Sequence, residues 1–342
     1  MQAPPKGGTP WNWGFAGDDW NGVDASGRPW RCLSGLRQSP INVPPLSVKR
    51  DGLLSSVLNL LGSGGDDTDE IPRNLRTSWF YPRLVSNGSN VEVINNGHTI
   101  QVEWLSPFAA DVQIAVPALQ FNTATVTAVL SMDAYDPAVR VRATPLQFHF
   151  HATSEHALVG RYFPLEMHIV HRVTGLPACD AAGGCIMVTG VLFELGSGGD
   201  NPLLEAIWEA MPLREGAINF LRAGADIRLG DLLPPLSARN YVTYEGSLTT
   251  PPCSEGLLWH VFLQPQKISQ AQWNKYRRAV GFRECNPRNA TGTTSTASHR
   301  RLLATAQPAG NPNNVTCGIA AYGYNFRNAQ KLNDRVVKVG LA

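Results

Sequence analysis

Hydrophobic and polar residues alternate in short runs along most of the chain, which is the pattern of half-buried β-strands. Runs that predict strands span 91–94, 99–104, 112–114, 124–132, 187–195 and 257–264, and helical spacing is confined to short stretches near 203–211 and 269–280. No uninterrupted apolar run approaches the roughly 18 residues that a transmembrane helix needs. We therefore expect a mainly β fold, a single domain over residues 1–342 around a large twisted, mostly antiparallel sheet with short peripheral helices.

Two segments interrupt this pattern and are predicted to be surface insertions, at about 51–75 and 286–316. The first combines a short apolar pattern with an acidic run, which predicts a small surface helix followed by an acidic loop. The second is rich in serine, threonine and asparagine and offers little apolar surface to bury. It also contains the dibasic pair Arg300-Arg301, at which proteolytic processing is possible.

A histidine pattern carries the first candidate chemistry. In the run QFHFH, residues 147–151, side chains two apart share one face of a strand, so His149 and His151 point the same way. The segment 161–173 is predicted to be a return strand with His168 on one face. If the two strands pair, three imidazoles converge with no fourth protein ligand. That is the ligand set of a catalytic zinc site, which keeps one position open for water.

The alternative is that these histidines are structural. A single histidine in a strand is more often a hydrogen-bonded structural residue than a ligand, and we interpret His156 and His171 in that way. Two histidines at i and i+2, with a third on the neighbouring strand, are much harder to explain as structural residues.

Further motifs give the chain a family resemblance. QSPIN at 38–42, NNGH at 95–98, GSLTTPPC at 246–253 and NFR at 325–327 accompany QFHFH, SEH and LEMHIVH. Together, and in this order over roughly residues 11–335, they resemble the α-class carbonic anhydrases, most closely the periplasmic enzymes of green algae. The resemblance implies the α-carbonic anhydrase fold. It also implies a zinc enzyme that reversibly hydrates CO2 to bicarbonate and a proton through a zinc-bound hydroxide.

The same resemblance assigns catalytic roles to three residues that do not bind the metal. Thr249 would accept the hydrogen bond of the hydroxide's proton and donate its own to Glu155, which requires an ionised Glu155. His98 matches the position that passes the released proton to buffer, a task that suits a histidine with a pKa of about 7. Taken alone, Thr249 could equally be a turn residue, Glu155 a solvated turn carboxylate and His98 an exposed turn histidine.

Orienting groups and a substrate wall are also implied. Ligating imidazoles are oriented through their second ring nitrogen. The resemblance gives this task to Gln147 for His149, to Glu166 for His168 and to the backbone carbonyl of Asn325 for His151. CO2 is apolar and needs an apolar wall beside the metal. The residues that match the substrate site are Val170, Val188, Leu248, Thr249 and Trp259, although each apolar one would also suit a core.

Six cysteines, an even number, favour three disulfides and an oxidising compartment. The resemblance pairs Cys32 with Cys253. The other expected pairs are Cys179 with Cys185, which bracket a short glycine-rich loop, and Cys285 with Cys317, which flank the second insertion. Six reduced cysteines are the alternative, but no CxxC pattern supports thiol ligands at Cys179 and Cys185.

The expected location is secreted or periplasmic. Residues 1–5 do not resemble a signal peptide, so the chain either is cytosolic or begins after a targeting segment, and the cysteines favour the second. Sequons at Asn87, Asn289 and Asn314 permit glycosylation without arguing for it, since about three are expected by chance in such a composition.

Composition narrows the partners and leaves three hypotheses. The chain is 43% hydrophobic and 16% charged, and its net charge of +2 gives no reason to expect nucleic acid or an anionic membrane as partner. A homo-oligomer is not indicated.

Besides a CO2 hydratase, a metal-free carbonic-anhydrase-related binding module and a zinc esterase are considered. The complete histidine set with Glu155 and Thr249 disfavours the first alternative, and no signature of a specific ester site supports the second.

Overall fold

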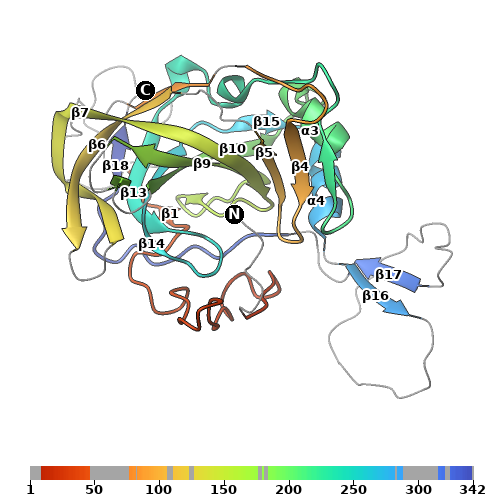
Figure 1. The fold of residues 1–342 in the computed structure, drawn as a ribbon, viewed down its shortest axis with the longest axis horizontal. Coiled ribbons are helices and arrows are strands. Elements are labelled where there is room, and N and C mark those ends of the chain that lie inside the picture. Colours follow the sequence, from red (N-terminus) through yellow and green to blue (C-terminus); the bar gives the residue numbers. More distant parts are fainter. Residues whose placement is uncertain are drawn as a thin grey trace.

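In a computed structural model of the chain, the described residues are 9–46, 77–81, 83–105, 111–122, 127–175, 179–180, 184–281, 283–287, 315–319 and 324–340. Their main feature is a large sheet in the order β11–β4–β5–β7–β9–β10–β14–β13–β18 (Figure 1). In that order the strands span Ile218–Phe220, Val91–Asn95, Ile100–Trp104, Thr127–His151, Leu165–Thr174, Cys185–Leu195, Glu255–Phe262, Tyr241–Ser247 and Lys338–Gly340. The predicted mainly β fold around a large sheet is confirmed.

Most neighbouring strands of this sheet are antiparallel, as predicted. Within the described part of this sheet, β10 is the exception, because it pairs in parallel with β14 and with β15 (Gln266–Ile268). β2 (Ser78–Phe80) and β6 (Asp111–Asn122) continue the sheet beside β7. Three two-stranded sheets accompany it: β1 (Asn42–Val43) with β8 (Ala157–Leu158), β3 (Leu84–Val85) with β12 (Asp226–Ile227), and β16 (Arg283–Pro287) with β17 (Val315–Ile319).

β7 differs from the prediction because it is one strand of 25 residues rather than a strand at 124–132 followed by a separate histidine strand. It pairs with β6 along its first part and with β5 and β9 near its end, and its register with β9 shifts between Pro145 and Gln147. The run 133–137, which contains two aspartates and a proline, breaks the alternation that the prediction depended on. The length of the strand therefore comes from its partners.

The helices lie close to their predicted positions. η1 (Pro202–Leu204) leads into α3 (Glu205–Ala210), and α4 spans Gln270–Val280. α4 begins at a capping box, in which the Ser269 side chain accepts from the Gln272 backbone N–H and the Gln272 side chain accepts in return. Two further 3₁₀ helices span Leu229–Leu232 and Leu236–Ala238. Among the described residues, no helix has the length and apolar character needed to cross a bilayer.

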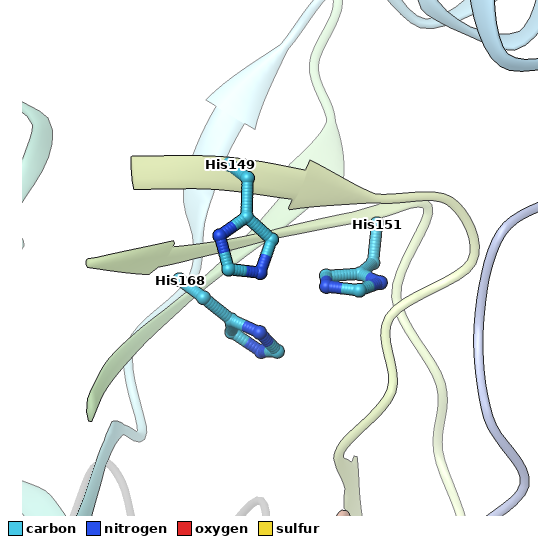
Figure 2. A group of neighbouring side chains, drawn as sticks. All are labelled: His149, His151 and His168. Carbon is cyan, nitrogen blue, oxygen red and sulfur yellow. The ribbon is translucent and has the colours of Figure 1, made fainter. Parts of the chain in front are cut away.

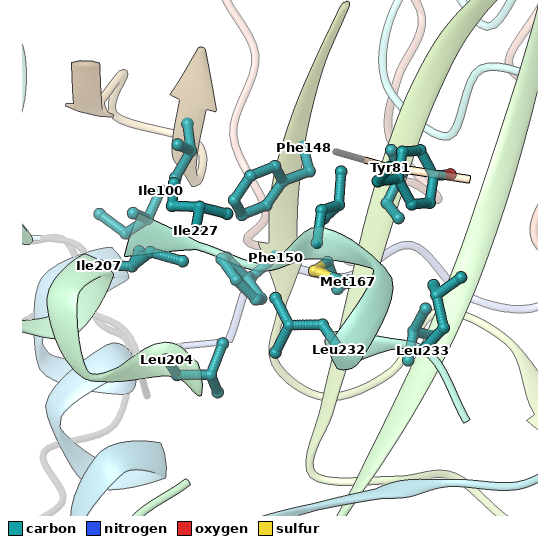
Figure 3. Close-up of a cluster of buried hydrophobic side chains, with 14 of the residues drawn as sticks. Tyr81, Ile100, Phe148, Phe150, Met167, Leu204, Ile207, Ile227, Leu232 and Leu233 are labelled. Atoms are coloured by element: carbon teal, nitrogen blue, oxygen red, sulfur yellow. The ribbon is translucent and has the colours of Figure 1, made fainter. Parts of the chain in front are cut away.

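The alternation of β7 separates the core from the histidines. Phe148 and Phe150 point to the face on which Met167 of β9 and Ile207 of α3 pack, and all four side chains are fully buried (Figure 3). Burying each of these side chains contributes about 1.5–3 kcal/mol. The intervening His149 and His151 necessarily point to the other face. The core therefore fixes where the histidines point.

The two predicted insertions lie largely outside the described residues. Residues 51–75 are not among them, and of 286–316 only the two ends are described, in β16 and β17. These two strands form a hairpin that projects from the rest of the molecule near α4 (Figure 1).

Candidate metal centre and active site

Three histidines meet on the face of the sheet opposite the main core. His149 and His151 lie at the end of β7, and the register with β9 places His168 directly opposite His149. Figure 2 shows the three rings turned toward a common point, and one nitrogen from each lies within 4.8 Å of the others. All three side chains are buried. The structure therefore brings together the three residues that were predicted as metal ligands.

Each ring is held through its second nitrogen, as expected. His149 Nδ1 donates to Gln147 Oε1 (2.9 Å), His151 Nδ1 donates to the Asn325 carbonyl (2.7 Å) and His168 Nε2 donates to Glu166 Oε1 (2.8 Å). The opposite nitrogens of His149 and His151 are buried and have no hydrogen-bond partner in the described structure. Because buried polar atoms are rarely left unpaired, these lone pairs fit a bound cation.

The protonation state of the rings suits metal binding. Burial lowers the pKa of His149, His151 and His168, and the proximity of the other imidazoles lowers the first two further. The rings are therefore neutral at neutral pH, which is the form that coordinates a metal ion.

Glu166 holds His168 and the neighbouring residues Glu155 and His156 in place. Its Oε1 accepts from His168 and from His156 Nδ1 (2.7 Å), and its Oε2 accepts the backbone N–H groups of Glu155 (2.9 Å) and His156 (2.8 Å). Burial alone would raise the pKa of Glu166, but the hydrogen bonds and electrostatic interaction with the two histidines outweigh it and hold the pKa low. His156 also meets the Tyr244 hydroxyl through Nε2 (2.7 Å), which agrees with its structural interpretation.

Sequence and fold both match one family. The family model of the eukaryotic-type carbonic anhydrases matches residues 67–340. The chain belongs to this family. A carbonic anhydrase of Neisseria gonorrhoeae is 31% identical over 282 residues, which cover 81% of this chain and 83% of that protein. Membership confirms that the chain is a carbonic anhydrase, as its motifs predicted.

Solved structures of carbonic anhydrases share the fold. Cah3 of Chlamydomonas reinhardtii, in complex with acetazolamide, has a TM-score of 0.59 and 27% identity, and the match covers 97% of this chain and 100% of that one. The α-carbonic anhydrase of Thermovibrio ammonificans has a TM-score of 0.53 and 28% identity, with 90% and 89% covered. The predicted likeness to an algal enzyme is thereby confirmed.

Thr249 and Glu155 lie beside the histidines of this carbonic anhydrase. Glu155 is fully buried, so its interpretation as a solvated turn carboxylate is wrong. Its Oε1 accepts the Arg327 backbone N–H (2.9 Å), and its Oε2 lies 3.8 Å from His168 Nδ1. Burial raises the pKa of Glu155, while the Thr249 hydroxyl and Arg327 oppose that effect.

The expected hydrogen bond between Thr249 and Glu155 is not formed with normal geometry. Thr249 Oγ1 and Glu155 Oε2 are both buried, and neither has a hydrogen-bond partner in the described structure. The hydroxyl is nevertheless close enough to lower the pKa of the carboxyl. The two side chains therefore lie near each other, but the hydrogen bond between them is not formed in the described structure.

The apolar wall forms one row across the sheet. Val170 of β9, Val188 of β10 and Trp259 of β14 are neighbours in register, and all three are buried. Leu248 packs against the same cluster, and the Trp259 ring lies 4.8 Å from the His168 ring. The residues expected to contact the substrate thus adjoin the histidines.

His98 occupies the turn between β4 and β5. Asn96 Oδ1 accepts the backbone N–H groups of His98 and Thr99 (both 2.9 Å), and Gly97 takes a φ of +84°, which favours glycine. The His98 ring is stacked on Trp11, with centroids 3.9 Å apart, and is half-buried rather than exposed. This burial lowers the pKa of His98 to about 4, below the value near 7 expected for a proton carrier.

Aromatic residues of the N-terminal segment are the part of the site that the motifs did not indicate. Trp11 stacks on His98, and Trp13 contacts both His98 and His151. The only signal in the sequence was the W-N-W spacing at 11–13 in a segment without strand or helix periodicity.

Two of the predicted disulfides are present, Cys32–Cys253 and Cys179–Cys185. The antiparallel register of β16 and β17 places Cys285 directly opposite Cys317. Of the glycosylation candidates, Asn87 is exposed, while Asn289 and Asn314 lie outside the described residues.

Proposed function

We propose that this carbonic anhydrase reversibly hydrates CO2 to bicarbonate and a proton, with Zn2+ held by His149, His151 and His168. The observation that carries the proposal is the set of three neutral, oriented imidazoles, two of which aim buried, unpaired nitrogens at one point. Zinc bound there would supply a nucleophile at neutral pH by lowering the pKa of water to about 7, a value established for carbonic anhydrases rather than obtained from this structure.

Thr249 orients the nucleophile in this proposal. Its hydroxyl has one proton to donate and lone pairs to accept with. If an ionised Glu155 takes the proton, Thr249 Oγ1 must accept from the attacking oxygen, whose remaining lone pair then faces the substrate. Glu155 is fixed as an acceptor by the Arg327 backbone N–H, which bonds its other oxygen. CO2 would lie against Val170 and Trp259, and the indole N–H of Trp259 already donates to the Ser247 carbonyl (3.0 Å).

Stopped-flow CO2 hydration combined with metal analysis tests this function and its alternatives. We expect about one zinc per chain and hydration activity that is lost on chelation and restored by zinc. Absence of bound zinc after zinc supplementation would support a metal-free binding module. A zinc-loaded protein that cleaves activated esters but does not hydrate CO2 would support an esterase.

His98→Ala should lower kcat for CO2 hydration roughly 10- to 100-fold in dilute buffer, since general acid–base groups contribute at least that much. The value of kcat/KM for CO2 hydration should change little, because proton release follows the chemical step. We propose that the His98 ring becomes more exposed when it carries the proton, because burial against Trp11 disfavours the charged form. Added imidazole should restore kcat. An unchanged kcat in dilute buffer would remove His98 from the proton route.

We further propose that the protein is secreted or periplasmic and contains a third disulfide, Cys285–Cys317. Two disulfides on the described residues and the pairing of β16 with β17 support this. Alkylation of the unfolded, unreduced protein followed by mass measurement should show no modified thiol. Two modified thiols would exclude the third disulfide, and six would reverse the assignment of the compartment. The same measurement would detect a glycan at the exposed Asn87.

A further inference from the structure

We propose that Trp13 is a positioning residue that holds the proton carrier His98 in a fixed place relative to the metal ligand His151. The proposal rests on the function proposed above. The indole Nε1 of Trp13 donates to the backbone carbonyl of His98 (3.0 Å). The same indole meets the His151 ring edge-to-face, with centroids 5.8 Å apart and an interplanar angle of 86°. One side chain therefore contacts both functional histidines.

A second link closes the connection between these residues. Asn325 Nδ2 donates to the same His98 carbonyl (3.0 Å), and the Asn325 backbone carbonyl accepts from His151 Nδ1 (2.7 Å). The His98 carbonyl thus receives two donors, and the residue that supplies each donor also contacts His151. Because a carbonyl with both lone pairs engaged has little freedom to rotate, the backbone at His98 is fixed with respect to His151.

The N-terminal segment is itself held in place, so Trp13 is preorganised. Trp20 Nε1 donates to the Asn12 carbonyl (2.8 Å), next to Trp13 in the chain. The Trp20 ring lies 5.2 Å from the Trp13 ring and 4.9 Å from that of Trp11, and Trp20 is almost fully buried. Edge-to-face aromatic contacts of this kind stabilise the packing beyond the effect of the buried area alone. The buried Trp20 therefore holds Trp13 in place, and Trp13 in turn holds His98.

The two contacts come from different parts of the Trp13 side chain: the indole N–H bonds the His98 carbonyl, and the ring faces His151. A phenylalanine would keep an aromatic ring against His151 but has no donor for the His98 carbonyl. The two functions of Trp13 are therefore separable by substitution. Proton transfer depends strongly on the placement of donor and acceptor, and a misplacement of about 1 Å can cost as much as 100-fold in rate. Loss of the N–H alone should consequently affect proton transfer and not metal binding.

The experiment compares Trp13→Phe, Trp13→Ala and Trp30→Phe in the full chain. Trp30 belongs to the same N-terminal aromatic cluster and serves as the control for general loosening of the segment. We expect Trp13→Phe to lower kcat about threefold to tenfold in dilute buffer, with unchanged kcat/KM, restoration by imidazole and an unchanged rate of zinc loss to a chelator. Trp13→Ala should lower kcat similarly and also accelerate zinc loss, because His151 loses its aromatic neighbour. Trp30→Phe should change neither quantity.

A double variant decides whether Trp13 acts through His98. In a His98→Ala background, Trp13→Phe should cause no further loss of kcat, since the residue that it positions is absent. An additional loss in that background, an equal fall of kcat and kcat/KM without rescue, or a wild-type kcat for Trp13→Phe would each overturn the proposal. If the wild-type protein binds zinc but does not hydrate CO2, the proposed function fails instead. The zinc-loss comparison of Trp13→Ala with Trp13→Phe then still tests the contact with His151.

Discussion

His149→Ala should abolish both zinc binding and CO2 hydration. The substitution removes one of three ligands from a site in which the described structure shows no replacement, and two imidazoles bind zinc far more weakly than three. It also leaves Gln147 Oε1 without the ring nitrogen that it now accepts from. We expect substoichiometric zinc after dialysis and a fall in kcat/KM of more than about 1000-fold, because the metal supplies the nucleophile. Metal analysis and stopped-flow hydration measure the two losses.

Gln147→Ala is the matched control for that result. It keeps all three ligands and removes only the acceptor that orients His149, so we expect a smaller loss of roughly 10- to 100-fold in zinc affinity. The ordering of the two variants distinguishes a ligand from the residue that orients it. Stoichiometric zinc in His149→Ala, or a larger loss in Gln147→Ala, would contradict the ligand assignment.

The histidine pair was predictable from sequence because strand geometry is local. Side chains at i and i+2 share a face whatever the rest of the fold does, so the QFHFH run alone places His149 and His151 together. The third ligand required only that β9 return beside β7. The same period-2 reasoning also placed Phe148 and Phe150 on the opposite face, where both are fully buried in the core.

Groups far apart in sequence could not be placed in this way. Asn325 accepts from His151 across 174 residues, and Trp13 reaches His98 across 85. The first was assigned only because its motif resembles a family, and the second belongs to no such motif. Such contacts depend on the tertiary fold of the whole chain, which local sequence patterns do not determine.

A strand that is buried on both faces is hard to predict from sequence, because its apolar and polar residues do not alternate. All seven residues of β13 are buried, so its sequence shows no alternation and the strand was not predicted. The burial of the His98 ring could not be predicted from the sequence either. The NNGH motif gives its turn, but only the fold shows that Trp11 covers the ring and that burial lowers its pKa to about 4.

Thr249→Val should lower kcat/KM for CO2 hydration about 100-fold while the zinc content stays stoichiometric, since removing one well-placed hydrogen-bonding group near a reacting oxygen costs that much or more. Valine keeps the shape of threonine but loses the hydroxyl that orients the nucleophile. Thr249 contributes no atom to the three-imidazole site, so metal binding should not follow activity. Thr249→Ser is the matched control, because it retains the hydroxyl and should recover most of the activity.

Glu155→Gln should reduce kcat/KM to a similar extent. Both substitutions disrupt the same interaction between Thr249 and Glu155, so their effects should not be independent. An amide nitrogen in place of Glu155 Oε2 would donate to Thr249 Oγ1 instead of accepting from it, which reverses the polarity of the pair. The Arg327 backbone N–H would still find an acceptor in the amide oxygen, so the local fold should be kept. If the residues act as one unit, the double variant Thr249→Val with Glu155→Gln should be little worse than either alone. Multiplicative losses would show that Thr249 does not act through Glu155.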